Sequence, residues 1–191
     1  MYEALVFVAA AASFITAALY IRAMFRGAAK PNRVTWLMWS IAPFIGTAAA
    51  VYSGVTWAAV PVFMMGFSPF LIFIASFFTE KAYWKLGGFD YLCGGLSALA
   101  LLLWVVTMDP DVSIMLAIVS DAIAAVPTLT KAYRMPQTEA IWPFLTGIFN
   151  STVSLIVAVT WSFAEVAFPI YLLALNLLLV ALLARAISSR Q

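Results

Sequence analysis

The stretch AVPVFMMGFS at residues 59–68 returns 108 positions later as AFPIYLLALN at residues 167–176, with side chains of matching size and polarity. In both copies a proline is the third residue, and one polar side chain follows it seven residues later. An internal repeat in a strongly apolar chain predicts a membrane protein made of two equivalent halves.

The composition indicates that the chain folds in a bilayer. Of its 191 residues, 65% are hydrophobic and 9% are charged, and the mean hydropathy is +1.05. A soluble domain of this size could not bury so much apolar surface. A membrane span needs about 20 mostly apolar residues, so we expect an all-helical integral membrane protein with little chain left for a soluble domain. Seven transmembrane helices are predicted, at 3–24, 35–53, 56–79, 90–108, 112–132, 140–160 and 163–185.

The lysines and arginines predict the orientation of these helices. All ten basic residues lie at or beyond the ends of the first, third, fifth and seventh segments, and the other connections hold only uncharged or acidic residues. The positive-inside rule therefore predicts an outside N-terminus and a cytoplasmic C-terminus. Because no basic region precedes the first apolar run, we expect that run to remain as a helix and not to be removed as a signal peptide. The basic residues are Arg22, Arg26, Lys30, Arg33, Lys81, Lys85, Lys131, Arg134, Arg185 and Arg190.

Residue types that are missing or rare argue against several classes of protein. The chain has no histidine, which argues against histidine-based acid–base catalysis, haem ligation and histidine metal sites. Its single cysteine, Cys93, excludes an internal disulfide and a cysteine metal cluster, so we expect a small packing residue there. The chain lacks a glycine-rich phosphate loop, and the last helix lacks the lysine that a retinal Schiff base requires. We therefore expect no enzyme, no cofactor, no metal site and no nucleic-acid partner.

The repeat extends beyond the opening stretch. Trp36 and Trp142 lie 106 positions apart, each just after a basic connection that contains a proline, KPNR at 30–33 and RMPQ at 134–137. The first three helices therefore correspond to the last three. A three-helix unit ends on the opposite side of the membrane, so one extra crossing keeps both copies in the same orientation. The predicted architecture is a three-helix bundle at 1–86, a linker helix at 87–110 and a second three-helix bundle at 111–191.

Two segments of the second half carry a resemblance to a known family. PTLTKAYR at 127–134, followed by Thr138-Glu139, looks like the segment for which PQ-loop proteins are named. WPF at 142–144 looks like the start of the sixth helix of SWEETs. With two parallel three-helix repeats and this orientation, the whole chain resembles the SWEET/PQ-loop superfamily. The resemblance implies transport of a sugar-like or vitamin-like solute, or a receptor that binds a ligand or cargo without transporting it, and it is compatible with a homo-oligomer such as a trimer.

The chain departs from the pattern of that superfamily at several positions. Thr128 stands where the PQ-loop segment has its glutamine. Tyr20 and Leu37 stand where SWEETs have prolines in their first two helices. Val62 and Ile170 stand where SWEET sugar sites have asparagine, so the resemblance does not make sugar the expected substrate.

Asp121 is the first candidate for the functional site. It lies about nine residues, or roughly 13 Å, into the fifth predicted helix, which places it near the middle of the membrane. An ionisable residue at this depth usually faces a cavity or another helix. We expect Asp121 to couple protons to transport or to bind a cationic or hydroxylated solute; the alternative is a structural carboxylate that is hydrogen-bonded to another helix.

Two stripes at i, i+4 spacing lie at equivalent places in the halves. An aromatic residue followed by hydroxyl and amide side chains suits binding of a small polar ring, although such stripes also occur as contacts between helices or as interfacial anchors. Ser68 and Asn176 form a further repeat-related pair that we expect to line the transport path. Four prolines, Pro61, Pro127, Pro143 and Pro169, are candidate hinges, with static kinks as the alternative. The stripes are Trp36, Ser40, Pro43 and Thr47 in the first half and Trp142, Thr146, Asn150 and Ser154 in the second.

These observations predict a facilitator or secondary transporter of a small polar solute in a bacterial-type inner (plasma) membrane, working by rocking of two three-helix bundles. Its expected partners are the solute, the lipid bilayer and other copies of the chain. The alternative is a non-transporting ligand- or cargo-binding receptor of the same superfamily.

Overall fold

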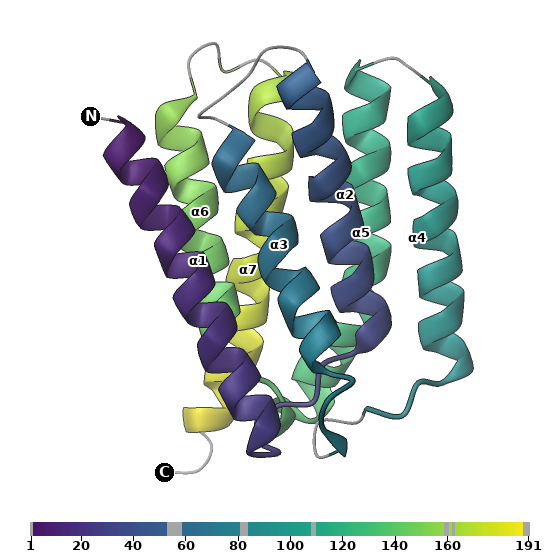
Figure 1. The fold of residues 1–191 in the computed structure, drawn as a ribbon. Coiled ribbons are helices and arrows are strands. Elements are labelled where there is room, and N and C mark those ends of the chain that lie inside the picture. Colours follow the sequence, from purple (N-terminus) through teal and green to yellow (C-terminus); the bar gives the residue numbers. More distant parts are fainter. Residues whose placement is uncertain are drawn as a thin grey trace.

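The computed structural model of this chain describes residues 2–52, 59–80, 84–107, 110–158, 161 and 163–188. These residues form seven α-helices and one short 3-10 turn (Figure 1). The predicted all-helical fold is confirmed, and each predicted segment matches one helix, with the largest difference, four residues, at the end of α3. The elements are α1 (Tyr2–Phe25), α2 (Arg33–Tyr52), α3 (Ala59–Ala75), α4 (Gly88–Thr107), α5 (Pro110–Arg134), η2 (Pro136–Thr138), α6 (Trp142–Val157) and α7 (Phe163–Ser188).

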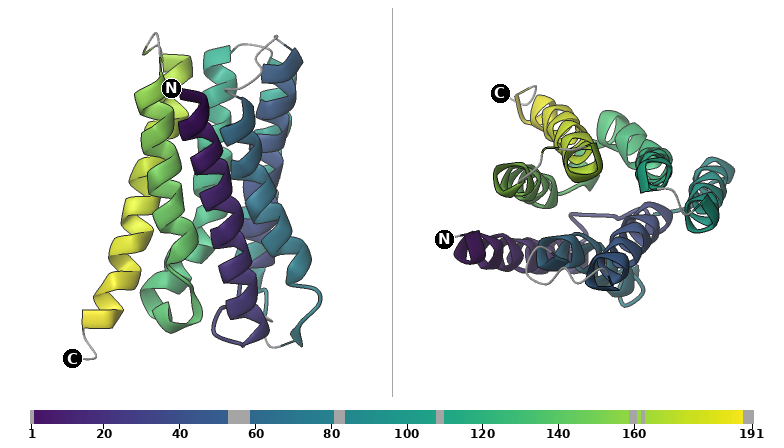
Figure 2. Two further views of the ribbon diagram at one scale, coloured as in Figure 1. Left: turned by 60° about the vertical axis from the view of Figure 1, so that its left-hand side comes forward. Right: turned by 90° about the horizontal axis from the view of Figure 1, so that it is seen from above.

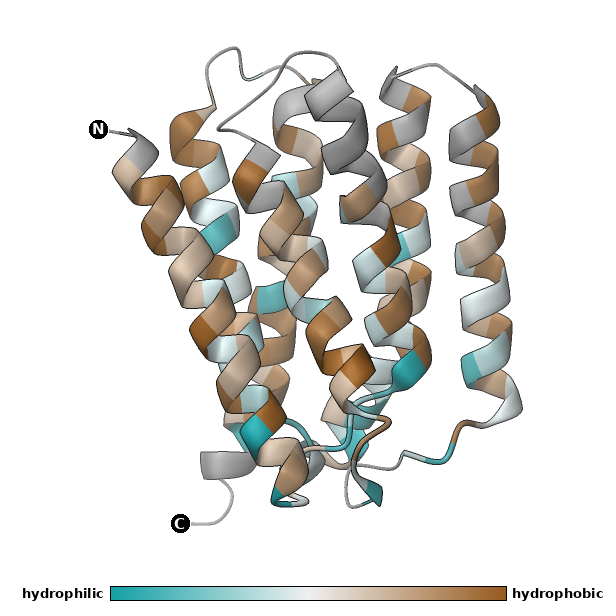
Figure 3. Cartoon of the chain, viewed as in Figure 1, coloured by the Kyte–Doolittle hydropathy of each residue, from teal (hydrophilic) through white to brown (hydrophobic). Residues whose placement is uncertain are grey.

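Three helices are long and apolar enough to cross a membrane. These are α1 over Ala4–Phe25, α5 over Ile114–Arg134 and α7 over Val166–Arg185. Large apolar side chains such as Phe14 and Val106 are exposed on the outer surface of the helices, and Figure 3 shows apolar residues along most of their length. A soluble monomer rarely exposes so much apolar surface. The chain is therefore a membrane protein, while a crossing by all seven helices stays a prediction.

The helices pack as two triplets of the same internal order. In the first triplet, α3 contacts both α1 and α2; in the second, α7 contacts both α5 and α6. The triplets meet through contacts of α1 with α6 and of α2 with α5, and α4 packs against α5 and α2. Seen from above in Figure 2, α1, α3 and α2 form one row, α6, α7 and α5 form the other, and α4 stands outside.

Each triplet has an apolar core of its own. In the first, Tyr20 and Met24 of α1 pack with Trp36 of α2 and Ile72 of α3. In the second, Phe144 of α6 packs with residues of α5 and α7. The Trp39 side chain contacts both cores, because it lies where α2 faces the second triplet. Each triplet thus has its own apolar core, and Trp39 makes an aromatic contact between the two cores.

Two of the four candidate hinge prolines lie at helix starts. Pro61 is in the first turn of α3, and Pro143 is at the start of α6. In the first turn of a helix the missing N–H of proline removes no intrahelical bond, so proline there does not kink the helix. Pro127 and Pro169 lie inside α5 and α7, as a hinge requires. Two more prolines that interrupt helices, Pro43 in α2 and Pro69 in α3, were not among the predicted hinges.

The basic residues that the structure describes gather at one end of the bundle, which we call the basic end. The connections α1–α2, α3–α4 and α5–α6 and the last turns of α7 lie there (Figure 1). This arrangement matches the charge pattern on which the predicted orientation depends. The described basic residues are Arg22, Arg26, Lys30, Arg33, Lys85, Lys131, Arg134 and Arg185.

Candidate functional site

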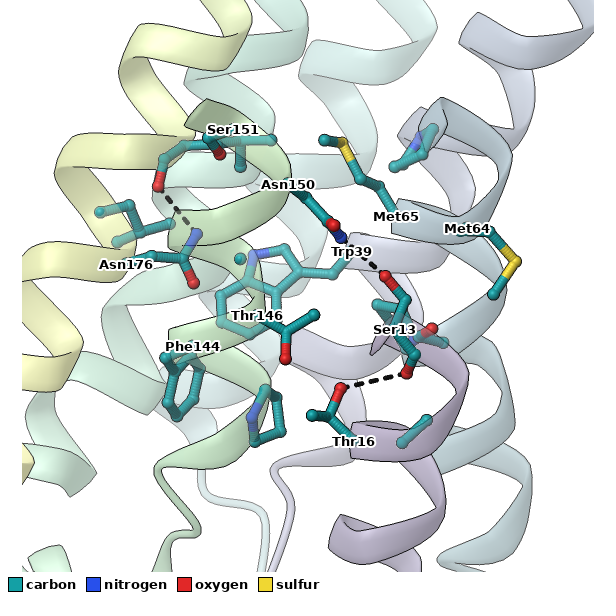
Figure 4. A pocket seen from close by; sticks show the side chains of 18 of the residues that line it. Ser13, Thr16, Trp39, Met64, Met65, Phe144, Thr146, Asn150, Ser151 and Asn176 are labelled. Atoms are coloured by element: carbon teal, nitrogen blue, oxygen red, sulfur yellow. Dashed lines mark hydrogen bonds between the residues drawn. The ribbon is translucent and has the colours of Figure 1, made fainter. Parts of the chain in front are cut away.

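A cavity lies between the two triplets, near the middle of the helices (Figure 4). Its volume is about 120 Å³, and all six helices of the triplets contribute to its wall. Among the described residues, none of α4 lines it. We call it the central cavity. Its polar lining residues are Ser13, Thr16, Ser68, Asp121, Thr146, Asn150, Ser151 and Asn176.

Most of the site residues predicted from sequence lie in this wall. They come from α2, α3, α5, α6 and α7, so the fold brings together positions that are far apart in the chain. Pro127 is buried in α5 and Pro169 is partly buried in α7, and neither lines the cavity. The side chains of Thr47 and Pro61 lie outside the described residues. The predicted residues in the wall are Trp36, Pro43, Ser68, Asp121, Pro143, Thr146, Asn150 and Asn176.

Three members of the predicted stripes lie elsewhere. Trp142 is 54% exposed on the outer surface, whereas Trp36 is buried at 2%. Ser40 donates a hydrogen bond to the Trp36 carbonyl oxygen of its own helix, at 2.7 Å, and does not reach the cavity. Ser154 likewise donates to the Asn150 carbonyl, at 3.0 Å.

The stripe in α6 is therefore corrected. The wall residues of α2 are Trp36, Trp39 and Pro43, and their spacing returns in α6 as Pro143, Thr146 and Asn150, 107 positions later and not 106. A shift of one residue along a helix corresponds to a rotation of about 100° around its axis. Pairing Trp36 with Trp142 therefore predicts the wrong face of α6 for the cavity. The i, i+3, i+7 pattern is the one that faces the cavity.

Asn150 connects the two triplets across the cavity. Its amide Nδ2 donates to the Ser13 hydroxyl of α1 at 2.7 Å (Figure 4). That hydroxyl donates to the Ala9 carbonyl at 2.9 Å. The other amide atom, Oδ1, is buried and accepts no hydrogen bond from any described residue. A buried polar atom without a partner costs about 1–3 kcal/mol. This acceptor is therefore available to a donor on a molecule that enters the cavity.

Two hydroxyls in the same wall have the same property. The Oγ atoms of Ser68 in α3 and Ser151 in α6 are buried, and no described residue hydrogen-bonds them. Nearly all buried polar groups in proteins have partners. The indole Nε1 atoms of Trp36 and Trp39 are buried in the same wall, also without a described hydrogen-bond partner. Because five such atoms gather in one wall and come from both triplets, the cavity can hold a solute through hydrogen bonds to both.

The position of Asn176 depends on a glycine of the neighbouring helix. Asn176 lies against Gly147 of α6, and a Cβ at position 147 would overlap the Asn176 amide. The amide Nδ2 donates to the Leu172 carbonyl at 2.8 Å. Gly147 thus makes room for the Asn176 side chain between α6 and α7, where both residues border the cavity (Figure 4).

Asp121 is buried in α5 and borders the cavity. Its Oδ2 accepts a hydrogen bond from the Tyr171 hydroxyl of α7 at 2.8 Å. The Trp39 indole N–H of α2 also lies toward the carboxylate, without the geometry of a hydrogen bond. The partners of this carboxylate among the described residues are therefore neutral donors.

A second polar group joins the triplets at the basic end. Lys131 of α5 forms an ion pair with Glu139 Oε1 at 2.5 Å, and its Nζ also donates to the Lys30 carbonyl. The Tyr20 hydroxyl of α1 donates to Glu139 Oε2 at 2.6 Å, and the Lys30 backbone N–H donates to the Thr138 carbonyl at 2.9 Å. We call these five residues the Lys131 cluster.

The Lys131 cluster lies between the cavity and the basic end along α1 and α5. Tyr20 follows the wall residue Thr16 by one helical turn, and Lys131 follows Asp121 by ten residues, about 15 Å along α5. Lys131 is 1% exposed, and Tyr20 is fully buried. Nearby, the Thr35 hydroxyl of α2 donates to the Ala124 carbonyl of α5 at 2.7 Å. The triplets are therefore joined by a buried polar contact on this side of the cavity.

Sequence reasoning missed several of these residues. Ser13 and Thr16 lie on one face of α1 but do not differ in type from ordinary helix-contact hydroxyls. Lys131 was counted only as a positive charge, and its partner Glu139 belongs to the connection after α5. Glu139 was one available signal, because it is an acidic residue on the basic side of the chain, a position that it shares with Glu80 and Asp90.

A comparison of the chain with protein-family models, with curated proteins and with solved structures found no match.

Proposed function

We propose that this protein transports a small polar solute across the membrane through the central cavity. The observation that carries the proposal is the position of the cavity: it lies between two equivalent triplets, at mid-helix, with polar atoms of both triplets in its wall. Sites in parallel-repeat transporters lie at the interface between the repeats, near the bilayer midplane. While the Lys131 cluster is formed, the solute enters the cavity from the end opposite the basic end.

The pattern of helix contacts supports the proposed architecture. If α1 corresponds to α5 and α2 to α6, then the contact of α1 with α6 has the contact of α5 with α2 as its counterpart. Both contacts are present. The middle helices α3 and α7 are exchanged in the same way. We therefore take the triplets as the two three-helix repeats of a SWEET-like protein, related by an axis along the membrane normal, with α4 as the linker.

The transport cycle follows from the two polar contacts. With the Lys131 cluster formed, the triplets are joined at the basic end and the solute reaches the cavity from the opposite end. Rocking of the triplets separates the cluster and opens the cavity toward the basic end, which the positive-inside rule makes cytoplasmic. A cavity of about 120 Å³ is smaller than drug-sized sites of roughly 300–1,000 Å³, so the solute is compact.

The orientation is testable by labelling. In a Cys93→Ala background, cysteines introduced at Asp111 and at Arg26 lie on opposite sides of the membrane in the proposed topology. Asp111 should react with an impermeant maleimide added outside intact cells, and Arg26 only after permeabilisation. Reaction of both from outside contradicts the topology.

A receptor of the same architecture is the second candidate. The buried Lys131–Glu139 pair favours it, because breaking a buried pair leaves an uncompensated charge, which costs about 3–5 kcal/mol. A receptor could bind its ligand with the cluster intact, whereas a transporter must separate it.

Flux in liposomes distinguishes the two functions. Compounds that raise the melting temperature of the purified protein identify ligands, and uptake of the best ligand into proteoliposomes is then measured. Thr146→Val and Thr152→Val form a matched pair, since both hydroxyls bond to their own helix and only Thr146 lines the cavity. We expect Thr146→Val to reduce uptake several-fold and Thr152→Val to leave it unchanged. Binding without uptake contradicts transport and supports a receptor.

A further inference from the structure

The charged lining of the central cavity is negative only, as far as the described residues show. Asp121 is the only charged side chain that lines it among the described residues. The described lysines and arginines lie at the basic end, where Lys131 pairs with Glu139 and Arg185 lies over the Tyr133 ring. A solute in the cavity therefore meets a carboxylate and no positive side chain of the described chain.

Among the described residues, no positive side chain pairs with this carboxylate. The Tyr171 hydroxyl that hydrogen-bonds it is neutral, and so is the Trp39 indole beside it. An ionised carboxylate in an apolar interior is costly unless a positive charge lies close to it. A cation in the cavity would supply that charge, whereas an anion would be repelled.

Aromatic rings stand next to the carboxylate. The Trp39 ring lies between Trp36, at 5.5 Å between ring centroids, and Phe144, at 6.4 Å, and both contacts are edge-to-face. All three rings belong to the cavity wall. Organic cations are attracted to ring faces, and most strongly to tryptophan. A carboxylate beside such a ring favours an organic ammonium ion over a small, strongly hydrated metal ion.

The unpartnered polar atoms in the rest of the wall indicate that the solute carries a second polar group. Asn150 Oδ1 requires a donor, the Trp36 and Trp39 indole N–H groups require an acceptor, and the Ser68 and Ser151 hydroxyls can donate or accept. A hydroxyl can both donate and accept, so an ammonium group at one end of the solute and a hydroxyl at the other would meet both sets of atoms. The size of the cavity limits such a molecule to a short one.

We propose that the solute of the central cavity is a compact organic ammonium ion, held with its charge against Asp121 and beside the Trp39 ring. This inference rests on the proposed function for its route across the membrane, but not for binding. It also assigns Trp39 as a residue that contacts the solute.

Binding of choline tests the inference against 3,3-dimethylbutan-1-ol, a neutral molecule of the same shape. Titration calorimetry on the full-length protein in nanodiscs should show binding of choline and at least about tenfold weaker binding of the alcohol, a difference of about 1.4 kcal/mol. Asp121→Asn should remove that preference, while Glu80→Gln, which changes an exposed carboxylate, should keep it. The comparison of the two ligands on the unmodified protein needs no variant and so does not depend on the folding of Asp121→Asn.

The outcomes separate this inference from the transport proposal. Equal affinity for choline and the alcohol overturns the ammonium inference, as does no binding by choline, ethanolamine or tetramethylammonium. A neutral polyol that binds and is taken up into proteoliposomes overturns it too, but leaves transport standing. Choline that binds in an Asp121-dependent way without uptake supports the inference and contradicts transport.

Discussion

The Lys131 cluster and the central cavity both place polar groups between the two triplets, yet they differ in how those groups are satisfied. In the cluster, the Lys131 ammonium and both oxygens of Glu139 have partners. In the cavity, the buried atoms Ser68 Oγ, Ser151 Oγ and Asn150 Oδ1 have none among the described residues. Satisfied buried networks fix one arrangement, whereas unsatisfied atoms can bind a ligand. In the function that we propose, this difference gives closure to the cluster and solute binding to the cavity.

Removal of Glu139 should have the largest effect. Glu139→Ala leaves the Lys131 charge buried without its partner, which costs about 3–5 kcal/mol. The closed arrangement should weaken, so that a cysteine placed at Thr16 becomes reactive from the basic end in the Cys93→Ala background. Loss of reactivity on adding Lys131→Met to this variant would show that the unpaired charge caused the opening. Unchanged reactivity in Glu139→Ala would contradict the role of the cluster in closure.

A methyl group at position 147 should have a smaller but clear effect. Gly147→Ala places a Cβ where the Asn176 amide lies, and overpacking of this kind costs about 1–3 kcal/mol. Gly95→Ala is the control, because nothing lies within 4 Å of a Cβ there, and alanine favours a helix over glycine by about 1 kcal/mol. Thermal unfolding should show a lower midpoint for the first and an equal or higher midpoint for the second. A stable Gly147→Ala that also keeps solute affinity would show that Asn176 is not held in place by Gly147.

Loss of the hydrogen bond between Asn150 and Ser13 should have the smallest effect on stability. Ser13→Ala removes the Asn150 partner and the bond to Ala9, each worth about 1 kcal/mol. Because Asn150 lies in the wall, we expect solute affinity to fall more than the melting temperature does. Thr152→Val on the exposed face provides the control. If Ser13→Ala lowers the melting temperature but leaves solute affinity unchanged, the contact between Asn150 and Ser13 is purely structural.

The sequence predicted the positions of the helices well, but it predicted less well which side of each helix faces the cavity. Long apolar runs predicted all seven helices, because hydrophobic length is a local property of the chain. The face that α6 turns to the cavity depends on the path of the connection before it, which contains η2, and a comparison of residue types cannot show that path. Trp142 was therefore assigned to the cavity in place of Pro143.

The Lys131 cluster could not be predicted for a related reason. Lysine is almost never fully buried unless it is paired, and the partners of Lys131 come from two different connections. Only the three-dimensional arrangement brings Lys30 and Glu139 to the same ammonium group. In contrast, Asp121 was found from its depth in the helix alone, since an ionisable residue at that position is rare in any sequence.

Cross-linking of the triplets at the basic end tests the central claim most directly. The backbones of Lys30 and Thr138 are joined by a hydrogen bond of 2.9 Å, so cysteines at these positions in the Cys93→Ala background lie close enough for a disulfide. Uptake of the bound solute into proteoliposomes should stop on oxidation and return on reduction, with binding retained in both states. Equal uptake by the oxidised and reduced protein would contradict transport by separation of the two triplets.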